Sequence, residues 1–197
     1  SEASAQKVQA NVATASGKIV LEQGDASDQT WCETTRQKIY QDYGRLDFLI
    51  CNASPPIRPL WLDLHDLNRI QEFLHQSLAL TTVPMASYLE LLNAGSGWNV
   101  VISSSVAHQV TPIEWPHYVS AKCAIEGLTR VAAKEYSQVN FLIVRPPKLL
   151  TDQMNTPLDR EGAISTTAVA QKIVQRLKEN VATQKLEILE DFSSTKT

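Results

Sequence analysis

Two side chains near the middle of the chain have the types and spacing needed for proton transfer. Tyr118 and Lys122 are four residues apart, so in a helix they lie on the same side. A phenol has an ordinary pKa of about 10, and a neighbouring ammonium lowers that pKa because it stabilises the phenolate. A serine from the run Ser103–Ser105 could hold a carbonyl oxygen while charge develops on it. These residues predict general acid–base chemistry on a carbonyl group.

The pair alone is weak evidence, because a tyrosine and a lysine at this spacing usually belong to a solvated helix surface. The surrounding elements must therefore place them in a site. Apolar segments alternate with helical patterns along the chain, which predicts a parallel sheet covered by helices on both faces. The apolar segments lack strict polar alternation, as expected when both faces of the sheet are buried. We expect strands at 18–23, 46–51, 98–103, 139–145 and 185–189, and helices at 2–15, 28–43, 66–92, 116–137 and 166–180.

The fold class predicted from this alternation is α/β, with one parallel sheet between two layers of helices. Residues 1–192 are expected to form a single domain and residues 193–197 a tail. Asp28 is a candidate helix cap, and Pro84 predicts a kink or break in the long helix. Residues 148–164 are expected to form a loop.

Composition excludes several classes of function. The chain has 197 residues, 43% of them hydrophobic, and a net charge of −3 without long runs of one sign, which argues against a nucleic-acid partner. No apolar run reaches the roughly 18–20 residues of a membrane-spanning helix. Because the cysteines are isolated, a reducing, cytoplasmic location is expected. The three cysteines form no paired motif, and the four histidines fit no ligand spacing, so no metal is expected.

The residues around Tyr118 resemble the short-chain dehydrogenase/reductase family. The spacing of thirteen residues between the family's serine and its Tyr-x-x-x-Lys motif selects Ser105 from the three serines. Ala124-Ile-Glu-Gly-Leu-Thr-Arg is also similar to the family's active-site helix. Three further motifs stand in the family's order along the chain. Asp25 with Ala26 and Asn52 with Ala53, the latter pair after a buried strand, lie upstream of Tyr118, and Arg145-Pro146 leading to Thr151 lies downstream. The resemblance covers about residues 1–155. It implies an α/β fold with a doubly wound parallel sheet of Rossmann type, whose N-terminal portion is absent from this sequence.

The resemblance implies a role for each matched residue. Tyr118 would donate the proton, Lys122 would lower the pKa of Tyr118 and hold the nicotinamide ribose, and Ser105 would orient the carbonyl. The cofactor implied is NADP, with NAD possible, and the hydride would come from it. Cofactor contacts are implied at Asp25, Ala26, Asn52, Ala53, Tyr118, Lys122, Pro146 and Thr151.

The chain departs from the family pattern in four places. None of its seven glycines forms the family's Gly-x-x-x-Gly-x-Gly turn, so we expect about 35–45 further residues upstream. Pro147 stands where the family has a glycine, which stiffens that loop. Cys51 and Ser54 replace two residues of the Asn-Asn-Ala-Gly motif. Near the asparagine that many members carry on the long central helix stand Gln76 and Ser77, and Gln76 is the candidate replacement.

Two classes of function follow. The first is an oxidoreductase that reduces a ketone to a secondary alcohol, with a small-molecule or carrier-bound carbonyl substrate. A β-ketoacyl thioester is preferred by analogy with carrier-protein ketoreductases. The second is a non-catalytic or assembly domain of a larger multienzyme that keeps an ancestral reductase site. A dehydratase or epimerase that uses the same Tyr–Lys pair is a third reading. Members similar to this chain commonly pair through their two long helices, so a homo-oligomer is expected.

Overall fold

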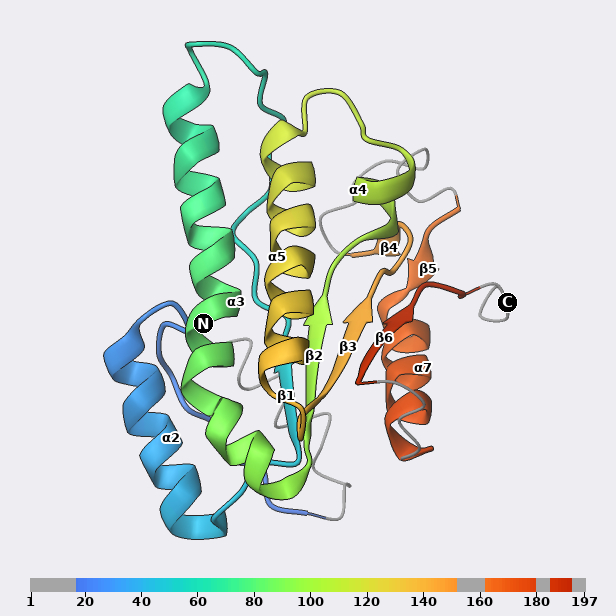
Figure 1. Ribbon diagram of the computed structural model, residues 1–197. Coiled ribbons are helices and arrows are strands. Elements are labelled where there is room, and N and C mark those ends of the chain that lie inside the picture. The colour runs from blue at the N-terminus through green and yellow to red at the C-terminus, as the bar shows by residue number, and fades with distance from the viewer. Residues whose placement is uncertain (1–16, 152–161, 180–184, 193–197) are drawn as a thin grey trace.

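The computed structural model describes residues 17–151, 162–179 and 185–192. Its main sheet has four parallel strands in the order β1-β2-β3-β6 (Figure 1). Helices α3 and α5 cover one face of the sheet, and α7 covers the other. The predicted class, a parallel Rossmann-like sheet between helices, is confirmed. The bounds are β1 Phe48–Cys51, β2 Trp98–Ile102, β3 Asn140–Val144, β6 Leu186–Leu189, α3 Leu67–Gly95, α5 Pro116–Glu135 and α7 Thr166–Lys178.

The two central strands are buried on both faces, which explains why their sequences lack polar alternation. In β2, Val101 packs against α3 and α5, whereas Trp98 and Val100 pack against α7. The register pairs Trp98 with Asn140 and Ile102 with Val144, so the carboxyl ends of β2 and β3 finish at the same level. The candidate residues Ser103–Ser105 and Arg145–Pro146 directly follow these two strand ends in the sequence.

Local signals in the sequence set several helix ends as predicted. Helix α2 (Gln29–Tyr43) begins after Asp28, whose carboxylate accepts the backbone N–H groups of Thr30 and Trp31. It ends at Gly44, whose φ of 72° suits a residue without a side chain. Helix α3 continues past Pro84 as one helix, so of the predicted kink or break the break is excluded.

The segment 18–23 is not a strand, so that prediction was wrong. A strand needs a hydrogen-bonding neighbour, and within the described residues β1 pairs only with β2. Ile19, Val20 and Leu21 are consequently exposed. Phe48 and Ile50 of the edge strand β1 are also about half exposed, at 46% and 52%. The helix expected at 2–15 and the tail at 193–197 lie outside the described residues.

The region expected as a loop at 148–164 contains a short parallel pair, β4 (Leu149–Leu150) and β5 (Ile164–Ser165), while 152–161 lie outside the described residues. A five-residue helix, α4 (Ser105–Gln109), was not predicted. No helix among the described segments is long and apolar enough to cross a membrane. The described residues also contain no group of three or more side chains arranged to hold a metal ion.

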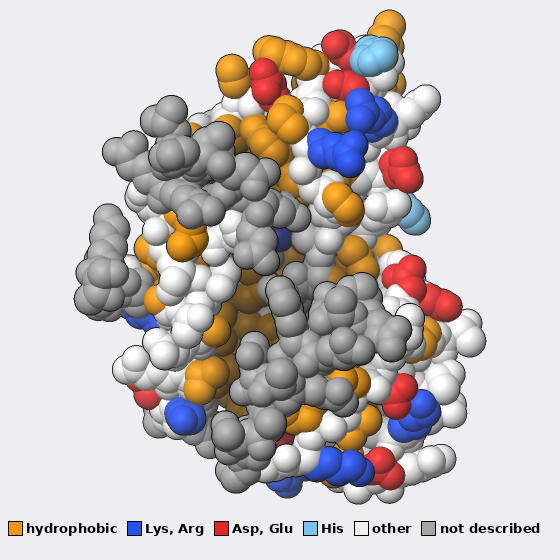
Figure 2. Space-filling view, turned by 180° about the vertical axis from the view of Figure 1, so that it is seen from behind, with side chains coloured by type: hydrophobic (Ala, Val, Ile, Leu, Met, Phe, Trp, Pro, Cys, Tyr) orange, Lys and Arg blue, Asp and Glu red, His pale blue; other side chains and the backbone are white. Residues whose placement is uncertain are grey.

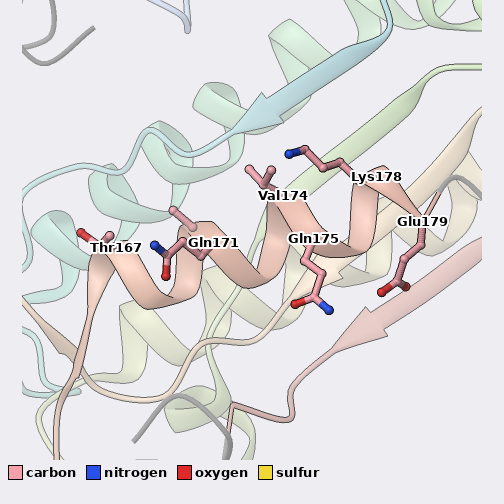
Figure 3. Close-up of a pocket in the computed structure, with 7 residues that line it drawn as sticks. Thr167, Gln171, Val174, Gln175, Lys178 and Glu179 are labelled. Carbon is pink, nitrogen blue, oxygen red and sulfur yellow. The ribbon is translucent and has the colours of Figure 1, made fainter. Parts of the chain in front are cut away.

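A hollow of about 680 Å³ lies along α7 and contains none of the predicted site residues (Figure 3). Val174, one of its lining residues, is 47% exposed. Seen from behind, the molecule shows apolar side chains in a recess near its centre (Figure 2). The chemistry-bearing residues gather elsewhere, at the carboxyl ends of the strands. The hollow along α7 is lined by Thr167, Ala170, Gln171, Val174, Gln175, Lys178 and Glu179.

Candidate active site

Tyr118 and Lys122 lie in the first two turns of α5, directly above the end of β2. The Nζ atom of Lys122 is 5.8 Å from the centroid of the Tyr118 ring. The same Nζ donates a hydrogen bond to the carbonyl oxygen of Ile102, the last residue of β2, at 2.9 Å. Helix α5 begins at Pro116, whose fixed φ and missing N–H suit the first helical position. The helix geometry thus places the pair together, as the spacing predicted.

Burial controls the electrostatics of this pair. Burial lowers the pKa of Lys122 to about 8, so its ammonium still carries most of its charge at neutral pH. Burial also raises the pKa of the Tyr118 phenol, and a hydrogen bond with the Ser104 side chain acts in the opposite direction. A protonated Lys122 beside a partly desolvated phenol interacts with it more strongly than it would in water.

The three adjacent serines have three different partners. The hydroxyl and the backbone N–H of Ser105 both donate to the carbonyl oxygen of Pro146, at 3.1 and 3.0 Å. The Ser104 side chain contacts Tyr118, and the Ser103 hydroxyl donates to Glu126 at 2.7 Å. The structure therefore brings Ser105 together with Pro146, a predicted cofactor residue, and places Ser104 against the phenol. Family spacing could not foresee this division.

A small cavity of about 10 Å³ lies beside Tyr118 and Lys122, with residues of α3 and α5 in its wall. Its size is close to the roughly 10–15 Å³ that one water requires. The hydroxyl of Ser77, from α3, lines it and has no hydrogen-bond partner among the described residues. Gln76, the predicted replacement for the family asparagine, is exposed, and its amide donates to Glu72 at 3.3 Å. The lining is Ala53, Ser54, Phe73, Ser77, Tyr118, Ala121, Lys122 and Ile125.

Ser77 is therefore the polar α3 residue that reaches the site, and the choice of Gln76 was wrong. The helical period contained the signal: Ile70, Phe73 and Ser77 fall on the buried side of α3 at spacings of three and four residues. Gln76 falls outside that stripe.

The predicted cofactor residues are distributed around the carboxyl edge of the sheet. Ala53 lines the cavity with Tyr118 and Lys122, while Asn52, directly after β1, is exposed. Thr151, after β4, is also exposed.

Asp25 and Ala26 form the turn before α2. The carboxylate of Asp25 accepts the backbone N–H and the hydroxyl of Ser27, which lowers its pKa. The Cys32 thiol contacts the Ala26 carbonyl at 3.5 Å, and Cys32 belongs to an apolar cluster that includes Leu49 of β1. The turn is thereby held near β1.

The described residues fit the nicotinamide and ribose portion of a dinucleotide. The ammonium of Lys122 is buried and makes one hydrogen bond within the described segments, to Ile102, although an ammonium can make three. Its remaining donors suit the hydroxyl groups of a ribose. The carboxyl edge of a parallel sheet is also where doubly wound folds bind their ligands.

An aromatic cluster supports the start of α5. His117 is fully buried, with the Phe73 ring edge-on to it at 4.5 Å and the Trp115 ring stacked at 5.9 Å. Burial lowers the pKa of His117, so the neutral imidazole is favoured. The ring centroid of Trp115 lies 6.2 Å from that of Tyr118. His117 thus contacts Phe73, which lines the cavity, and Trp115, which in turn contacts Tyr118.

The carboxyl edge of this sheet is where a doubly wound fold can bind a dinucleotide, and comparison with known proteins shows the family. A family model described as short chain dehydrogenase matches residues 1–162. The chain therefore belongs to the short-chain dehydrogenase family. The sequence is 24% identical over 186 residues to 15-hydroxyprostaglandin dehydrogenase (NAD(+)) of Rattus norvegicus, covering 83% of this chain and 68% of that protein.

The human protein of that name is 28% identical over 123 residues, covering 62% of this chain and 44% of that protein. A solved structure of an alcohol dehydrogenase from the archaeon Thermococcus sibiricus, complexed with 5-hydroxy-NADP, superposes with a TM-score of 0.79 at 22% identity. The superposition covers 97% of this chain and 82% of that one, and it confirms the fold. The chain thus spans between about two fifths and two thirds of the length of these two curated relatives.

Proposed function

We propose that this chain carries the catalytic part of an NAD(P)H-dependent reductase that converts a ketone to a secondary alcohol. The observation that carries the proposal is the buried, charged Lys122 beside Tyr118 in a cavity that Ala53 also lines. Tyr118 would protonate the developing alkoxide, and the charge on Lys122 would make the phenol a better acid. When bound, the nicotinamide supplies the hydride.

A serine at the end of β2 would hold the carbonyl oxygen. Ser105 is the family choice. Its single O–H donates to the Pro146 carbonyl in the structure, so it would have to turn from that acceptor to the substrate carbonyl. Ser77 would hold one water against Lys122 and so connect the ammonium with solvent. Ser77, Tyr118 and Lys122 line one cavity, which keeps the proposed proton path short.

For the cofactor we propose NADPH first, with NADH measured beside it. The carrier-protein ketoreductases that this chain resembles motivate NADPH, whereas the names of the rat and human relatives specify NAD(+). Asp25 and Ala26 would border the adenine, Asn52 and Ala53 the middle of the cleft, and Thr151 the carboxamide. A cytoplasmic location and a homo-oligomer belong to the same proposal.

We propose an apolar substrate, with a β-ketoacyl thioester as the preferred class. Two loops at the carboxyl end of the sheet meet where the Leu60 N–H donates to the Glu114 carbonyl at 2.8 Å. They expose Trp61, Leu64 and Ile113 at 56%, 92% and 79%. Exposed apolar side chains gathered beside a site suit an apolar chain leading to the carbonyl. Leu64→Ser with Ile113→Ser should raise KM for 2-octanone and leave kcat unchanged.

The test is a fluorescence titration with NADPH and then NADH, followed by turnover of acetoacetyl-N-acetylcysteamine and 2-octanone. We expect saturable cofactor binding and reduction of the thioester. Tyr118→Phe should lose nearly all turnover and still bind cofactor. Binding without turnover of any carbonyl by the wild type would contradict the reductase and favour the assembly domain. A fully active Tyr118→Phe variant would remove Tyr118 from the mechanism.

A further inference from the structure

Glu126 is a fully buried carboxylate that the proposed chemistry does not use. It lies on α5, one helical turn beyond Lys122, with 0% of its surface exposed. Charged side chains are rarely buried in this way unless they are paired. The partners of Glu126 therefore indicate why the charge is there.

The carboxylate joins three elements to α5. Its Oε1 atom accepts hydrogen bonds from the Ser103 hydroxyl at 2.7 Å and from Arg145 Nε at 2.9 Å. Its Oε2 atom accepts from Arg145 Nη2 at 2.8 Å and from Arg130 Nη2 at 2.7 Å. The Nε2 atom of His108, on α4, lies 2.7 Å from Oε1. One side chain thus holds the ends of β2 and β3 and helix α4 against the helix that carries Tyr118.

Each strand-end contact of Glu126 is adjacent to a hydrogen bond within the candidate site. Ser103 directly follows Ile102, whose carbonyl accepts from Lys122. Arg145 directly precedes Pro146, whose carbonyl accepts from Ser105. A shift of either strand end relative to α5 would therefore separate the serines and the Pro146 segment from Tyr118 and Lys122.

The network keeps Glu126 ionised. Burial raises its pKa, but the hydrogen bonds from Arg145 and Ser103 and the nearby positive groups outweigh burial and hold the pKa at about 2. Arg145 also pairs with Glu190 beyond β6, at 2.9 Å. Buried ion pairs are seldom more stabilising than well-packed apolar residues of the same size. Stability alone gives little reason for such a network, whereas directional bonds to two strand ends fix their geometry.

We infer that Glu126 is a positioning residue that fixes the Ser105–Pro146 segment relative to Tyr118 and Lys122. This inference rests on the proposed function for its effect on turnover. Its structural half, that Glu126 holds the ends of β2 and β3, is measurable without turnover. Within the part of the chain that the structure describes, Glu126 bonds neither Tyr118 nor Lys122, so it acts through Ser103 and Arg145.

The test compares Glu126→Gln with a matched buried control on the same helix, Thr129→Ala. Thr129 is fully buried and bonds only the carbonyl of Ile125 in its own helix, among the contacts described. In full-length protein, Glu126→Gln should lower kcat for acetoacetyl-N-acetylcysteamine about tenfold or more, because small misplacements of catalytic groups are costly. Circular dichroism establishes a temperature at which both variants are folded. Glu126→Asp should recover part of the lost rate.

Amide hydrogen exchange supplies the second measurement. The Ser103 N–H donates to the Val144 carbonyl and the Ser105 N–H to the Pro146 carbonyl, at 2.7 and 3.0 Å. Glu126→Gln should speed exchange of these two amides about tenfold, since local opening of the strand ends becomes easier. Thr129→Ala should lower thermal stability and leave both amides and kcat close to wild type. Arg130→Gln, which removes a partly exposed partner, should behave like Thr129→Ala.

The outcomes separate the inference from the proposed function. Wild-type kcat and wild-type exchange in Glu126→Gln would overturn the inference. Equal effects of Glu126→Gln and Thr129→Ala would reduce Glu126 to a general stability residue and also overturn it. A wild type that binds no cofactor and reduces no carbonyl would refute the proposed function, and the exchange comparison would then decide alone whether Glu126 holds the strand ends.

Discussion

The Lys122 ammonium donates to the Ile102 carbonyl oxygen at 2.9 Å, so the proposed catalytic lysine also fastens α5 to the end of β2. The orientation of its charge toward Tyr118 is therefore fixed by the sheet rather than by a flexible side chain. A surface lysine at the same helical spacing would have neither the burial nor this anchor.

Lys122→Met should remove the charge while keeping most of the side-chain volume. We expect kcat to fall by roughly 10²–10³, within the range for loss of general acid–base assistance. Cofactor affinity should fall as well, because the ribose loses its donor. Steady-state kinetics and NADPH titration measure the two effects. Lys134→Met, at an exposed position in the last turn of α5, is the control and should match wild type.

The buried Lys122 also predicts how stability depends on pH. Its pKa falls from an ordinary 10.5 to about 8 on folding, so the folded state binds fewer protons between these two values. The contribution of Lys122 to the free energy of unfolding is therefore least favourable below pH 8. It should become more favourable as the pH increases from 8 toward 10.5. The unfolding free energy of wild type relative to Lys122→Met should increase by about 2–3 kcal/mol between pH 7 and pH 10.

Urea unfolding of both proteins at the two pH values gives this difference, because other titrating groups are common to them. A difference that stays constant with pH would show that the Lys122 ammonium is not destabilised by burial.

Most of the fold was accessible from the sequence, because apolar runs and helix caps are local signals. Asp28 and Gly44 set the ends of α2, and the continuous apolar character of 98–102 and 140–144 indicated strands buried on both faces. The predicted strand at 18–23 did not form, for a physical reason. An apolar, β-branched segment becomes a strand only beside a partner, and pairing is a property of the whole sheet.

The candidate site was accessible only in part. The spacing of Tyr118 and Lys122 placed them together, but it could not show which of three adjacent serines contacts the phenol. That assignment depends on how β2 passes into α4, where Ser105 turns toward Pro146. Glu126 had no distinguishing sequence pattern, because its partners Ser103 and Arg145 are distant in the chain and meet it only in the fold.

Ser77→Ala tests whether the α3 hydroxyl takes part in proton transfer. We expect kcat to fall about tenfold, less than the roughly 10²–10⁴ typical of a group that transfers the proton directly, because Ser77 would act through one water. Thermal stability should stay unchanged or rise slightly, since a buried hydroxyl that has no protein partner among the described residues is removed. Gln76→Ala, on the exposed side of α3, should leave both unchanged. Reversal of the two results would restore Gln76 as the residue that reaches the site.

The outward side of α5 predicts how copies of the chain pair. Leu128 and Val131 are 41% and 53% exposed, three residues apart, and so lie next to each other on the helix surface. We propose that a second copy covers them. Leu128→Arg with Val131→Arg should then convert the wild-type oligomer to a monomer, because two cations cannot be buried without partners at that contact.

Sedimentation velocity at several protein concentrations measures the change. Val174→Arg on α7, which is exposed to a similar degree, is the matched control and should leave the oligomer intact. If the double variant sedimented as wild type and Val174→Arg dissociated the oligomer, the contact would lie on the α7 side. A monomeric wild type at all concentrations would refute the pairing through α5.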